Sequence, residues 1–336
     1  MKKLGDVCEI KTGKKDTKNK EDDGEYPFFV RSNTVERINS YSYDGEAILT
    51  SGDGVGVGKN FHYINGKFDF HQRVYSLRKF KNGYIGKYIY YLFSDRFYDR
   101  VTRLSAKNSV DSVRMDMISG MQVYFPLSTE QTKISSFLSL IDERIQTQIK
   151  IIEQLKTLIK GLYQKLILTQ TPNVKLKDCV SCHSSSLAEA EILNERGIYP
   201  IFGATGIISY SENYQIDEDA IMIIKDGSGV GKVQYGTGRF SVIGTLNYLT
   251  VKSDVNLKYI FFCLKFFNFN KYKVGSGIPH IYFKDYGEAL IYCPSLDEQN
   301  KIEKLLSSID EKINLENTLL QKLKYQKKHL LQNLFI

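Results

Sequence analysis

Two glycine-rich loops carry the clearest chemical signal in this sequence. The first runs Asp53-Gly-Val-Gly-Val-Gly-Lys59 and the second runs Asp226-Gly-Ser-Gly-Val-Gly-Lys232. A nucleotide-binding P-loop would need glycine in place of each aspartate and serine or threonine after each lysine, where Asn60 and Val233 stand. Because glycine backbone and a lysine can still approach phosphate closely, we favour a nucleic-acid-facing hairpin. The alternative is a purely structural tight hairpin with glycines at positive φ.

Side chains that can bind base edges stand beside two expected strands of the first half of the chain. Arg31-Ser-Asn33 follows one strand, and His71-Gln-Arg73 precedes another. Such side chains can hydrogen-bond to bases in the major groove. The analogous places in the second half hold Gly203-Ala-Thr205 and Gly244-Thr-Leu246, so the two halves differ in contact chemistry.

Lysines at positions 14, 15, 18 and 20 form a basic run that suits phosphate groups, although a solvated loop is its commoner meaning. For every candidate contact, an ordinary exposed polar side chain is the default alternative. The candidate DNA contacts are Lys14, Lys15, Arg31, Ser32, Asn33, Lys59, His71, Gln72, Arg73, Lys107, Thr205, Lys225, Lys232, Thr245, Lys273 and His280.

The remaining motifs do not support metal binding or catalysis. Cys179-Val-Ser-Cys-His183 matches a haem-attachment pattern and half of a zinc site, but no second cysteine pair follows, so we favour buried thiols and expect no metal. The Asn/Asp-Pro-Pro-aromatic signature of amino-group DNA methyltransferases, the G-x-S-x-G elbow and H-E-x-x-H are missing. Glu9-Ile-Lys11 has the E-x-K spacing of nucleases without a preceding Pro-Asp pair. The sequence therefore predicts a non-enzymatic protein.

Composition favours a soluble, cytoplasmic protein with two globular domains. The 336 residues are 42% hydrophobic and 25% charged, and the five cysteines suit reduced thiols. We expect no membrane segment and no signal peptide. The net charge of +8 weakly favours an anionic partner. Residues 1–129 hold 21 basic and 16 acidic groups, whereas residues 171–297 hold 12 and 13, so the second domain would need a focused basic patch.

The sequence contains an internal repeat, and such a repeat predicts the overall architecture more directly than any local pattern. At an offset of 173 residues, Gly24-x-Tyr-Pro27 falls on Gly197-x-Tyr-Pro200, and the two glycine loops coincide. At an offset of 168, Glu130-Gln131 falls on Glu298-Gln299 within two matched tails. A tandem duplication explains both offsets, with a net loss of five residues between the glycine loop and the tail of the second copy.

Each matched tail predicts a long helix that presents a coiled-coil seam. Apolar residues step by alternating threes and fours, and Ser128 and Asp297 are the predicted N-caps. Since neither helix can bury its seam alone, we expect the two to pair as an antiparallel coiled coil with a pseudo-twofold axis and to act as a spacer. The predicted seam comprises Ile134, Leu138, Ile141, Ile145, Gln148, Ile152, Leu155, Ile302, Leu306, Ile309, Ile313, Glu316, Leu320 and Leu323.

Gln148 and Glu316 interrupt the two seams at the same register, near the middle of each helix. In an antiparallel pair they would face each other and fix the register at some cost in stability. The alternative is that each side chain reaches solvent.

The fold class is α+β, with two mixed α/β globular domains separated by the two paired helices. Short strands are expected at residues 26–30, 47–49, 74–77, 220–224 and 248–251. Buried helices are expected at 86–93 and 257–267, with strand as the alternative there. The expected domains are 1–129 and 171–297, with helices at 130–170 and 298–336.

In these features the sequence resembles the specificity subunit of type I restriction-modification systems. The resemblance covers the whole chain and rests on the order and duplication of its motifs. These motifs are Leu4-Gly-Asp6, the two Gly-x-Tyr-Pro strands, the doubled glycine loop, and the tails Pro126-Leu-Ser-Thr-Glu-Gln131 and Pro294-Ser-Leu-Asp-Glu-Gln299.

The resemblance implies two target recognition domains, each binding one half of a bipartite sequence in double-stranded DNA. It also implies no catalytic activity and no cofactor in this chain. Two modification subunits would bind S-adenosylmethionine and methylate adenine, and motor-nuclease subunits would cut DNA where they are present. Two alternatives stay open: a fragment of a self-contained DNA methyltransferase or restriction enzyme, and a coiled-coil adaptor that does not bind DNA.

Overall fold

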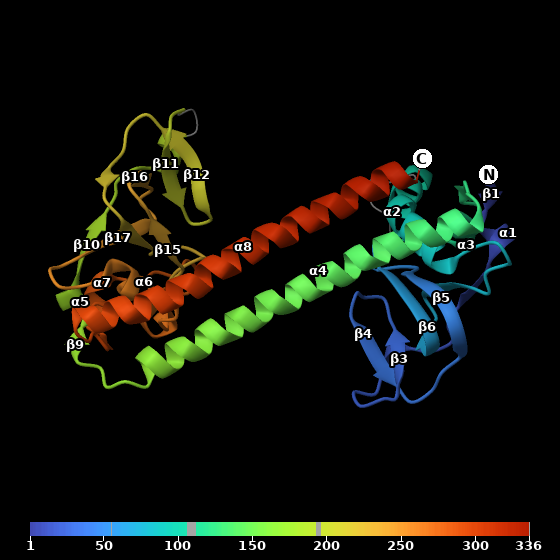
Figure 1. Ribbon diagram of the computed structural model, residues 1–336, viewed down its shortest axis with the longest axis horizontal. Coiled ribbons are helices and arrows are strands. Elements are labelled where there is room, and N and C mark those ends of the chain that lie inside the picture. The colour runs from blue at the N-terminus through green and yellow to red at the C-terminus, as the bar shows by residue number, and fades with distance from the viewer. Residues whose placement is uncertain (55, 106–111, 193–195, 336) are drawn as a thin grey trace. The chain divides into compact units, whose positions relative to one another are not determined.

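The computed structural model describes the chain except for residues 55, 106–111, 193–195 and 336 (Figure 1). The described residues form two compact units. Unit 1 comprises Met1–Gln148 and Leu319–Ile336, and unit 2 comprises Ile149–Thr318. Each unit contains one globular domain and parts of both long helices.

In unit 1, one sheet has the strand order β2-β7-β5-β6-β3-β4, and a short pair joins β1 to β8. The strands are β1 (Lys2–Lys3), β2 (Glu9–Thr12), β3 (Tyr26–Phe29), β4 (Val35–Ile38), β5 (Tyr43–Ser51), β6 (Phe61–Phe70), β7 (Val74–Arg78) and β8 (Gln122–Val123). The helices are α1 (Leu4–Val7), the 3-10 turn η1 (Thr17–Asn19), α2 (Gly86–Leu104), α3 (Met115–Ser119) and the first part of α4 (Ser128–Tyr163).

The central strand β5 shows why this sheet has a core on both faces. Successive side chains of a strand point to opposite faces, and Ala47, Ile48 and Leu49 are all fully buried. Ile48 belongs to the core that includes α2, whereas Ala47 and Leu49 pack with Phe29 and other aromatic side chains on the other side. Burial of such a side chain contributes about 2 kcal/mol, so a charged residue at position 48 would disrupt unit 1.

Unit 2 repeats this plan with a divided sheet. Its strand orders are β10-β17-β14-β15 and β12-β11-β16-β13, with a short pair β18-β9. The strands are β9 (Val174–Lys175), β10 (Val180–Ser184), β11 (Tyr199–Gly203), β12 (Gly206–Ser211), β13 (Ile216–Asp217), β14 (Ala220–Ile224), β15 (Val233–Gly236), β16 (Arg239–Val242), β17 (Leu246–Val251) and β18 (Leu290–Ile291). The helices are η2 (Gln164–Leu168, a π-helix), α5 (Leu176–Cys179), η3 (Glu189–Ile192), α6 (Leu257–Lys265), η4 (Phe269–Tyr272), α7 (Phe283–Tyr286) and the first part of α8 (Leu296–Leu334).

The strand β14 is the counterpart of β5 and is buried along its whole length. Ile221 and Ile223 join the core that contains α6, while Ala220, Met222 and Ile224 join the core on the other face. The strands expected from sequence are all present, and both expected helices form, although α2 continues to Leu104.

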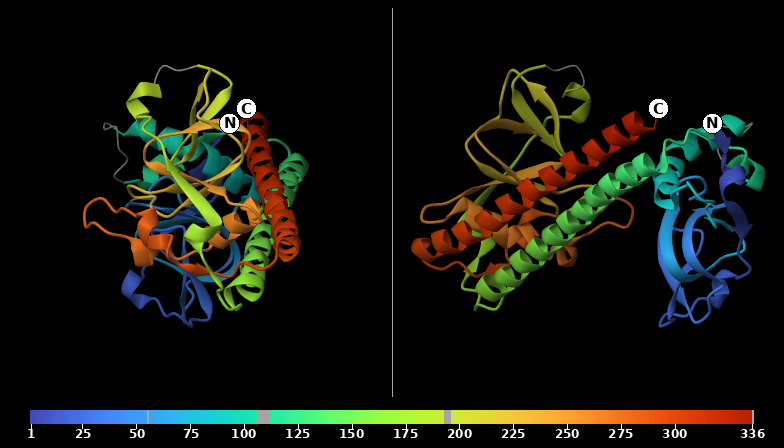
Figure 2. Two further views of the ribbon diagram at one scale, coloured as in Figure 1. Left: turned by 90° about the vertical axis from the view of Figure 1, so that its left-hand side faces the viewer. Right: turned by 45° about the vertical axis from the view of Figure 1, so that its right-hand side comes forward.

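The long helices contact each other within each unit (Figure 1, Figure 2). In unit 1, Ile134 and Leu138 of α4 share a core with Leu330 and Leu334 of α8, and Lys327 pairs with Asp142. In unit 2, Ile159 of α4 shares a core with Ile302, Leu306 and Ile313 of α8. The start of one helix therefore lies beside the end of the other in each unit.

Burial follows the predicted seam. Ile134, Ile141, Leu155 and Ile309 are half-buried, and the other seam residues, including Gln148 and Glu316, are buried. The alternation of threes and fours in the sequence thus marks the face of each helix that is removed from water.

The predicted N-caps were wrong by one or two positions. The helices begin at Ser128 and Leu296, and the carbonyls of Leu127 and Ser295 accept the first helical N–H bonds. Leu127 and Ser295 therefore occupy the N-cap positions, one residue before Ser128 and two residues before Asp297.

One buried glutamine connects each long helix to a globular domain, and the two glutamines do so in the same way. Gln131 donates to the carbonyl of Pro126 (2.8 Å) and accepts from the N–H of Ile85, the residue that precedes α2 (3.0 Å). Gln299 donates to the carbonyl of Pro294 (2.8 Å) and accepts from the N–H of Asn256, which precedes α6 (2.9 Å). The Glu-Gln motif of the sequence thus positions a domain helix against each long helix.

Candidate nucleic-acid interface

Sheet topology brings the first set of candidate residues to one edge of unit 1. Strands β3 and β6 are parallel, with Phe29 paired to Phe70, so the segments that follow them leave the sheet side by side. The N–H of His71 donates to the carbonyl of Phe29 (2.9 Å), and the N–H of Gln72 donates to the carbonyl of Lys15 (2.8 Å). Arg31, Arg73 and Lys15 therefore belong to neighbouring segments although they are distant in sequence.

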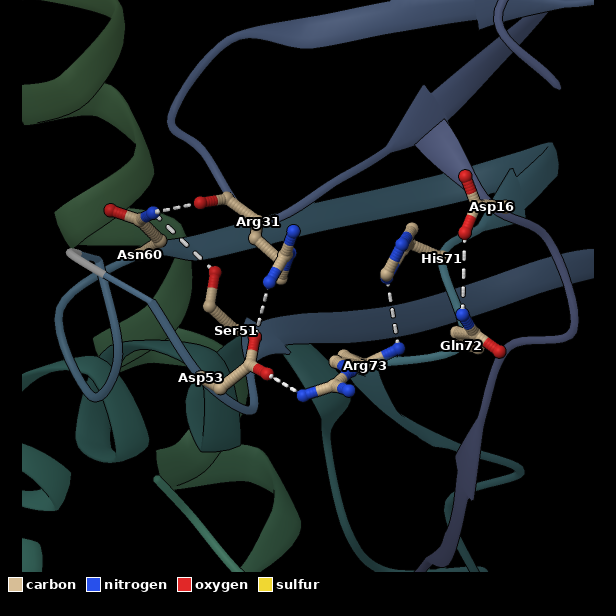
Figure 3. A network of polar contacts seen from close by, with 8 residues as sticks. All are labelled: Asp16, Arg31, Ser51, Asp53, Asn60, His71, Gln72 and Arg73. Carbon is tan, nitrogen blue, oxygen red and sulfur yellow. Dashed lines mark hydrogen bonds and ion pairs between the residues drawn. The ribbon is translucent and has the colours of Figure 1, made fainter. Parts of the chain in front are cut away.

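Asp53 is the centre of the polar network at this edge (Figure 3). Strand β5 pairs Ser51 with Val74, which places the following Asp53 beside Arg73. One carboxylate oxygen accepts from Nη1 of Arg31 at 3.0 Å, and the other accepts from Nη1 of Arg73. The Asp53 side chain is 16% exposed, against 42% for Arg31 and 62% for Arg73, so the arginines lie on the solvent side of the carboxylate.

Electrostatics keep this carboxylate ionised. Burial alone would raise the pKa of Asp53, but hydrogen bonds from Arg73 and Arg31 outweigh it and lower the pKa below its ordinary value. Two guanidinium groups and one carboxylate leave the cluster with one net positive charge at neutral pH, which favours an anionic or electron-rich partner.

Two buried side chains, His71 and Asn60, support this network through hydrogen bonds to the backbone of its arginines. Nδ1 of His71 accepts from the backbone N–H of Arg73 (3.0 Å), and burial together with the charge of Arg31 lowers the pKa of His71. His71 is thus a neutral support for the Arg73 backbone, not an exposed contact. Asn60 is also buried and its amide donates to the carbonyl of Arg31 (3.4 Å).

The other candidates of unit 1 are less concentrated. Lys59 is exposed, and its ammonium lies 4.8 Å from the centre of the Tyr98 ring. Ser32 donates to the carbonyl of Thr34 (2.9 Å) and is half-buried. Lys14, Asn33 and Gln72 are exposed, Lys15 is half-buried, and Lys107 lies outside the described residues.

The glycine loops are compact turns between the antiparallel strands β5 and β6 and between β14 and β15. The first and third glycines have positive φ in both copies: Gly54 (83°), Gly58 (68°), Gly227 (92°) and Gly231 (86°). Residues other than glycine rarely adopt this backbone conformation, which explains the repeated glycines. The glycines at positive φ that the structural alternative predicts are therefore present in both loops, and contact of these loops with DNA stays a prediction.

Unit 2 places its own candidates at the corresponding edge. Strands β11 and β16 are parallel, with Phe202 paired to Val242, so Thr205 and Thr245 follow neighbouring strand ends. Both threonines line a hollow of about 250 Å³ together with Asp226 and the second glycine loop. Among the described residues that line it there is no arginine, so this edge is chemically different from the Arg31–Arg73 edge.

Asp226 has a different partner from its counterpart Asp53. Its Oδ1 accepts from Nδ1 of His280 at 2.7 Å, and the backbones of the two residues form an isolated β-bridge. Asp53 forms the corresponding bridge with Ser112, which lies 168 residues before His280. Lys232 and Lys273 are exposed, and Lys225 is half-buried beside Asp226.

Sequence reasoning missed Asp53 and Asp226 as members of the site. Both were noticed only as departures from a P-loop. Both aspartates begin their glycine loops and recur at the same offset of 173 residues as the glycines. This recurrence was a signal that could have identified them.

Solved structures identify the fold. The S subunit of a type I restriction-modification system from M. genitalium matches with a TM-score of 0.78 at 19% identity, over 100% of this chain and 95% of that one. A second structure, reported in a study of complex assembly and conformational transition of the type I R-M system, matches with a TM-score of 0.56 at 13% identity, over 99% and 96% of the two chains. The molecule thus has the fold of an S subunit.

The sequence matches the family described as the type I restriction modification DNA specificity domain twice, over residues 1–157 and 171–325. The chain belongs to this family, which confirms the resemblance noted in the sequence.

Among curated relatives, the type I restriction enzyme EcoDI specificity subunit of Escherichia coli is 27% identical over 173 residues, 52% of this chain and 37% of that protein. A protein of Mycoplasma pneumoniae named as a type I specificity subunit is 25% identical over 331 residues, 91% of this chain and 88% of that protein. The chain thus spans little more than a third of the first relative's length and most of the second's.

Proposed function

We propose that this chain is the DNA-binding specificity subunit of a type I restriction-modification complex, with each globular domain recognising one half of a bipartite sequence in double-stranded DNA. The observation that carries the proposal is the repeated sheet edge. Each copy offers an aspartate, a glycine loop and the ends of two parallel strands, yet the side chains differ: two arginines in unit 1, and two threonines and a histidine in unit 2. One scaffold with two chemistries suits two different half-sites.

The long helices serve in this proposal as an antiparallel coiled-coil spacer between the half-site readers. Support comes from the burial of the seam residues and from the helix contacts within each unit. This proposal keeps the domain limits expected from the sequence: globular domains at 1–129 and 171–297, and helices at 130–170 and 298–336. Gln148 and Glu316, both buried polar residues of the seam, are proposed to fix its register.

We further propose that the chain itself is not catalytic and holds no cofactor. Two modification subunits would bind S-adenosylmethionine and methylate adenine, and motor-nuclease subunits, where present, would cleave DNA. No described helix combines the length and the apolarity needed to span a membrane. The complex would act on chromosomal DNA in the cytoplasm.

The long helices also carry a candidate surface for the modification subunits. Phe137 of α4 is 49% exposed, and Leu305 of α8, which lies 168 residues later at the same place in the repeat, is 44% exposed. Two equivalent apolar positions suit two copies of one partner.

A pair of variants tests this surface. Phe137→Ala or Leu305→Ala should each weaken binding of one modification subunit by roughly tenfold, the usual effect of truncating an apolar anchor. Analytical ultracentrifugation would measure the stoichiometry of the complex. Lys322→Ala, at an exposed position of α8, is the control. Unchanged binding of two modification subunits in the double variant would refute this assignment.

The central experiment expresses the chain with and without a modification subunit from its own host and sequences methylated adenines in the DNA. A two-part motif with a fixed gap, seen only when both are present, supports the proposal. Methylation by the chain alone would favour a self-contained enzyme. No methylation together with no salt-sensitive DNA binding by the complex would favour a protein-binding adaptor.

A further inference from the structure

Asp53 and Asp226 occupy the same place in the two domains, and each accepts hydrogen bonds from side chains that come from other segments. Asp53 binds Arg31, which follows β3, and Arg73, which follows β6. Asp226 binds His280, which is distant from the glycine loop in sequence. In both units the aspartate is a fixed acceptor, while the side chain that it holds differs between the copies.

The geometry leaves one edge of each guanidinium available. Asp53 engages Nη1 of Arg31 and Nη1 of Arg73, so Nη2 and Nε of each arginine are not used by this carboxylate. Asp53 itself is largely covered, whereas Arg73 is 62% exposed. An arginine held in this way loses less side-chain entropy when it binds a ligand, because part of its freedom is already lost in the free protein.

A role in stability alone explains this cluster less well. The guanidinium groups of both ion pairs are exposed, and ion pairs at the protein surface usually contribute little to the free energy of unfolding. A second arginine on one carboxylate also adds repulsion between two cations. The same cluster has an advantage if the arginines face a partner rich in hydrogen-bond acceptors, since each arginine presents a planar pair of donors.

We propose that Asp53 is a positioning residue that orients Arg31 and Arg73 to bind guanine, so that the half-site recognised by unit 1 contains guanine. The inference rests on the proposed function. Guanine presents the acceptors O6 and N7 in the major groove, and a bidentate arginine contact to them is the commonest specific contact between protein and DNA. Unit 2, where Asp226 holds His280 and the neighbouring strand ends carry Thr205 and Thr245, recognises its half-site without this arginine pair.

The test uses the whole complex of this chain with its modification subunits and sequences methylated adenines in host DNA. The variants are Arg73→Lys, Asp53→Asn and Asp53→Glu, with Arg144→Ala, an exposed charge on α4, as the control. Arg73→Lys keeps the charge but removes the planar donor pair. We expect it to lower discrimination for guanine over the other bases in one half of the motif by about tenfold or more. The other half should not change.

Asp53→Asn should lower the same discrimination by a smaller factor, and Asp53→Glu should restore part of it, because it restores the negative acceptor. A domain that merely loses stability would lose methylation in proportion at every site and would not relax a single base. Circular dichroism of each complex monitors folding, and fluorescence anisotropy on duplexes that differ at one guanine measures the discrimination directly.

The outcomes separate this inference from the proposed function. A wild-type motif without guanine in the half assigned to unit 1 overturns the inference and leaves the specificity function standing. The inference also fails if Arg73→Lys and Asp53→Asn change no base preference, or if they relax both halves equally. Failure of the wild-type complex to methylate or bind any bipartite sequence would overturn the proposed function itself.

Discussion

At the scale of single residues, a few buried polar side chains decide how the exposed ones are presented. Gln131 is 1% exposed and joins α4 to two other segments of unit 1: it donates to the carbonyls of Pro126 and Gly83 and accepts from the N–H of Ile85. Gln299 makes the equivalent contacts in unit 2. A buried polar group without a partner costs free energy, so each glutamine strongly favours one arrangement of its domain and its long helix.

Replacement of Gln131 tests this role. Gln131→Leu would leave the N–H of Ile85 and the carbonyls of Pro126 and Gly83 without this partner. We expect a loss of about 2–4 kcal/mol in the free energy of unfolding of unit 1, measured by urea denaturation with circular dichroism. Gln146→Leu, at an exposed position of the same helix, should change it by less than about 0.5 kcal/mol. Equal effects of the two substitutions would contradict the assigned role.

Asp53 gives a prediction in pH. Its pKa in the folded protein is lowered, so its ionised form adds stability above the ordinary carboxyl pKa of about 4, and that contribution is lost as the pH falls through the lowered value. Asp53→Asn should therefore destabilise unit 1 at pH 7, and the difference from the wild type should shrink toward pH 3. Urea unfolding at several pH values would measure it. A difference that stays constant from pH 7 to pH 3 would show that the charge of Asp53 is not involved.

At the scale of elements, the two long helices pack against the globular domains and are also proposed to act as a spacer. Their buried faces join the core of each unit, so neither helix is an independent rod. The proposed spacer role follows from their continuity, because α4 runs unbroken from Ser128 to Tyr163 and α8 from Leu296 to Leu334. A change in helix length should then change the distance between the bound half-sites.

Insertion of a heptad tests the spacer. Seven residues added after Gln148 and seven after Thr318, the limits of the two units, keep the apolar face of each helix in phase. The helices lengthen by about 10 Å, which corresponds to roughly three base pairs at about 3.4 Å each. Methylome sequencing should show a gap wider by about that number with both half-sites unchanged. An unchanged gap would remove the spacer role.

At the scale of the whole molecule, duplication gives the chain two globular domains that can vary separately. Each unit has its own cores, its own sheet edge and its own aspartate at the head of a glycine loop. One domain can therefore change its contacts without loss of packing in the other. This independence is the physical basis of the proposed recognition of two different half-sites by one chain.

Exchange of one domain tests the independence. Replacement of residues 1–127, which precede α4, with the matching domain of another family member should change one half of the methylated motif and keep the other half and the gap. The reciprocal exchange of the domain between α4 and α8 should change the other half. Sequencing of methylated adenines measures both outcomes. A change of both halves by a single exchange would refute modular recognition.

The sequence alone determined the repeat, the two long helices with their buried faces, the main strands and the family. These features depend on spacing along the chain: periods of two and of three to four, and the recurrence of glycine, proline and glutamine at fixed offsets. Its errors, such as the N-caps at Ser128 and Asp297, fall at helix ends, where a shift of one or two residues costs little.

Only the tertiary structure decided which of the candidate residues come together. Arg31, Arg73 and Asp53 meet because β3 is parallel to β6 and because β5 pairs with β7, and strand order cannot be obtained from local spacing. The structure likewise gave His71 a buried supporting role and paired Asp226 with His280, 54 residues away. Contacts of this kind depend on which strands pair through backbone hydrogen bonds, and strands that pair can be far apart in sequence.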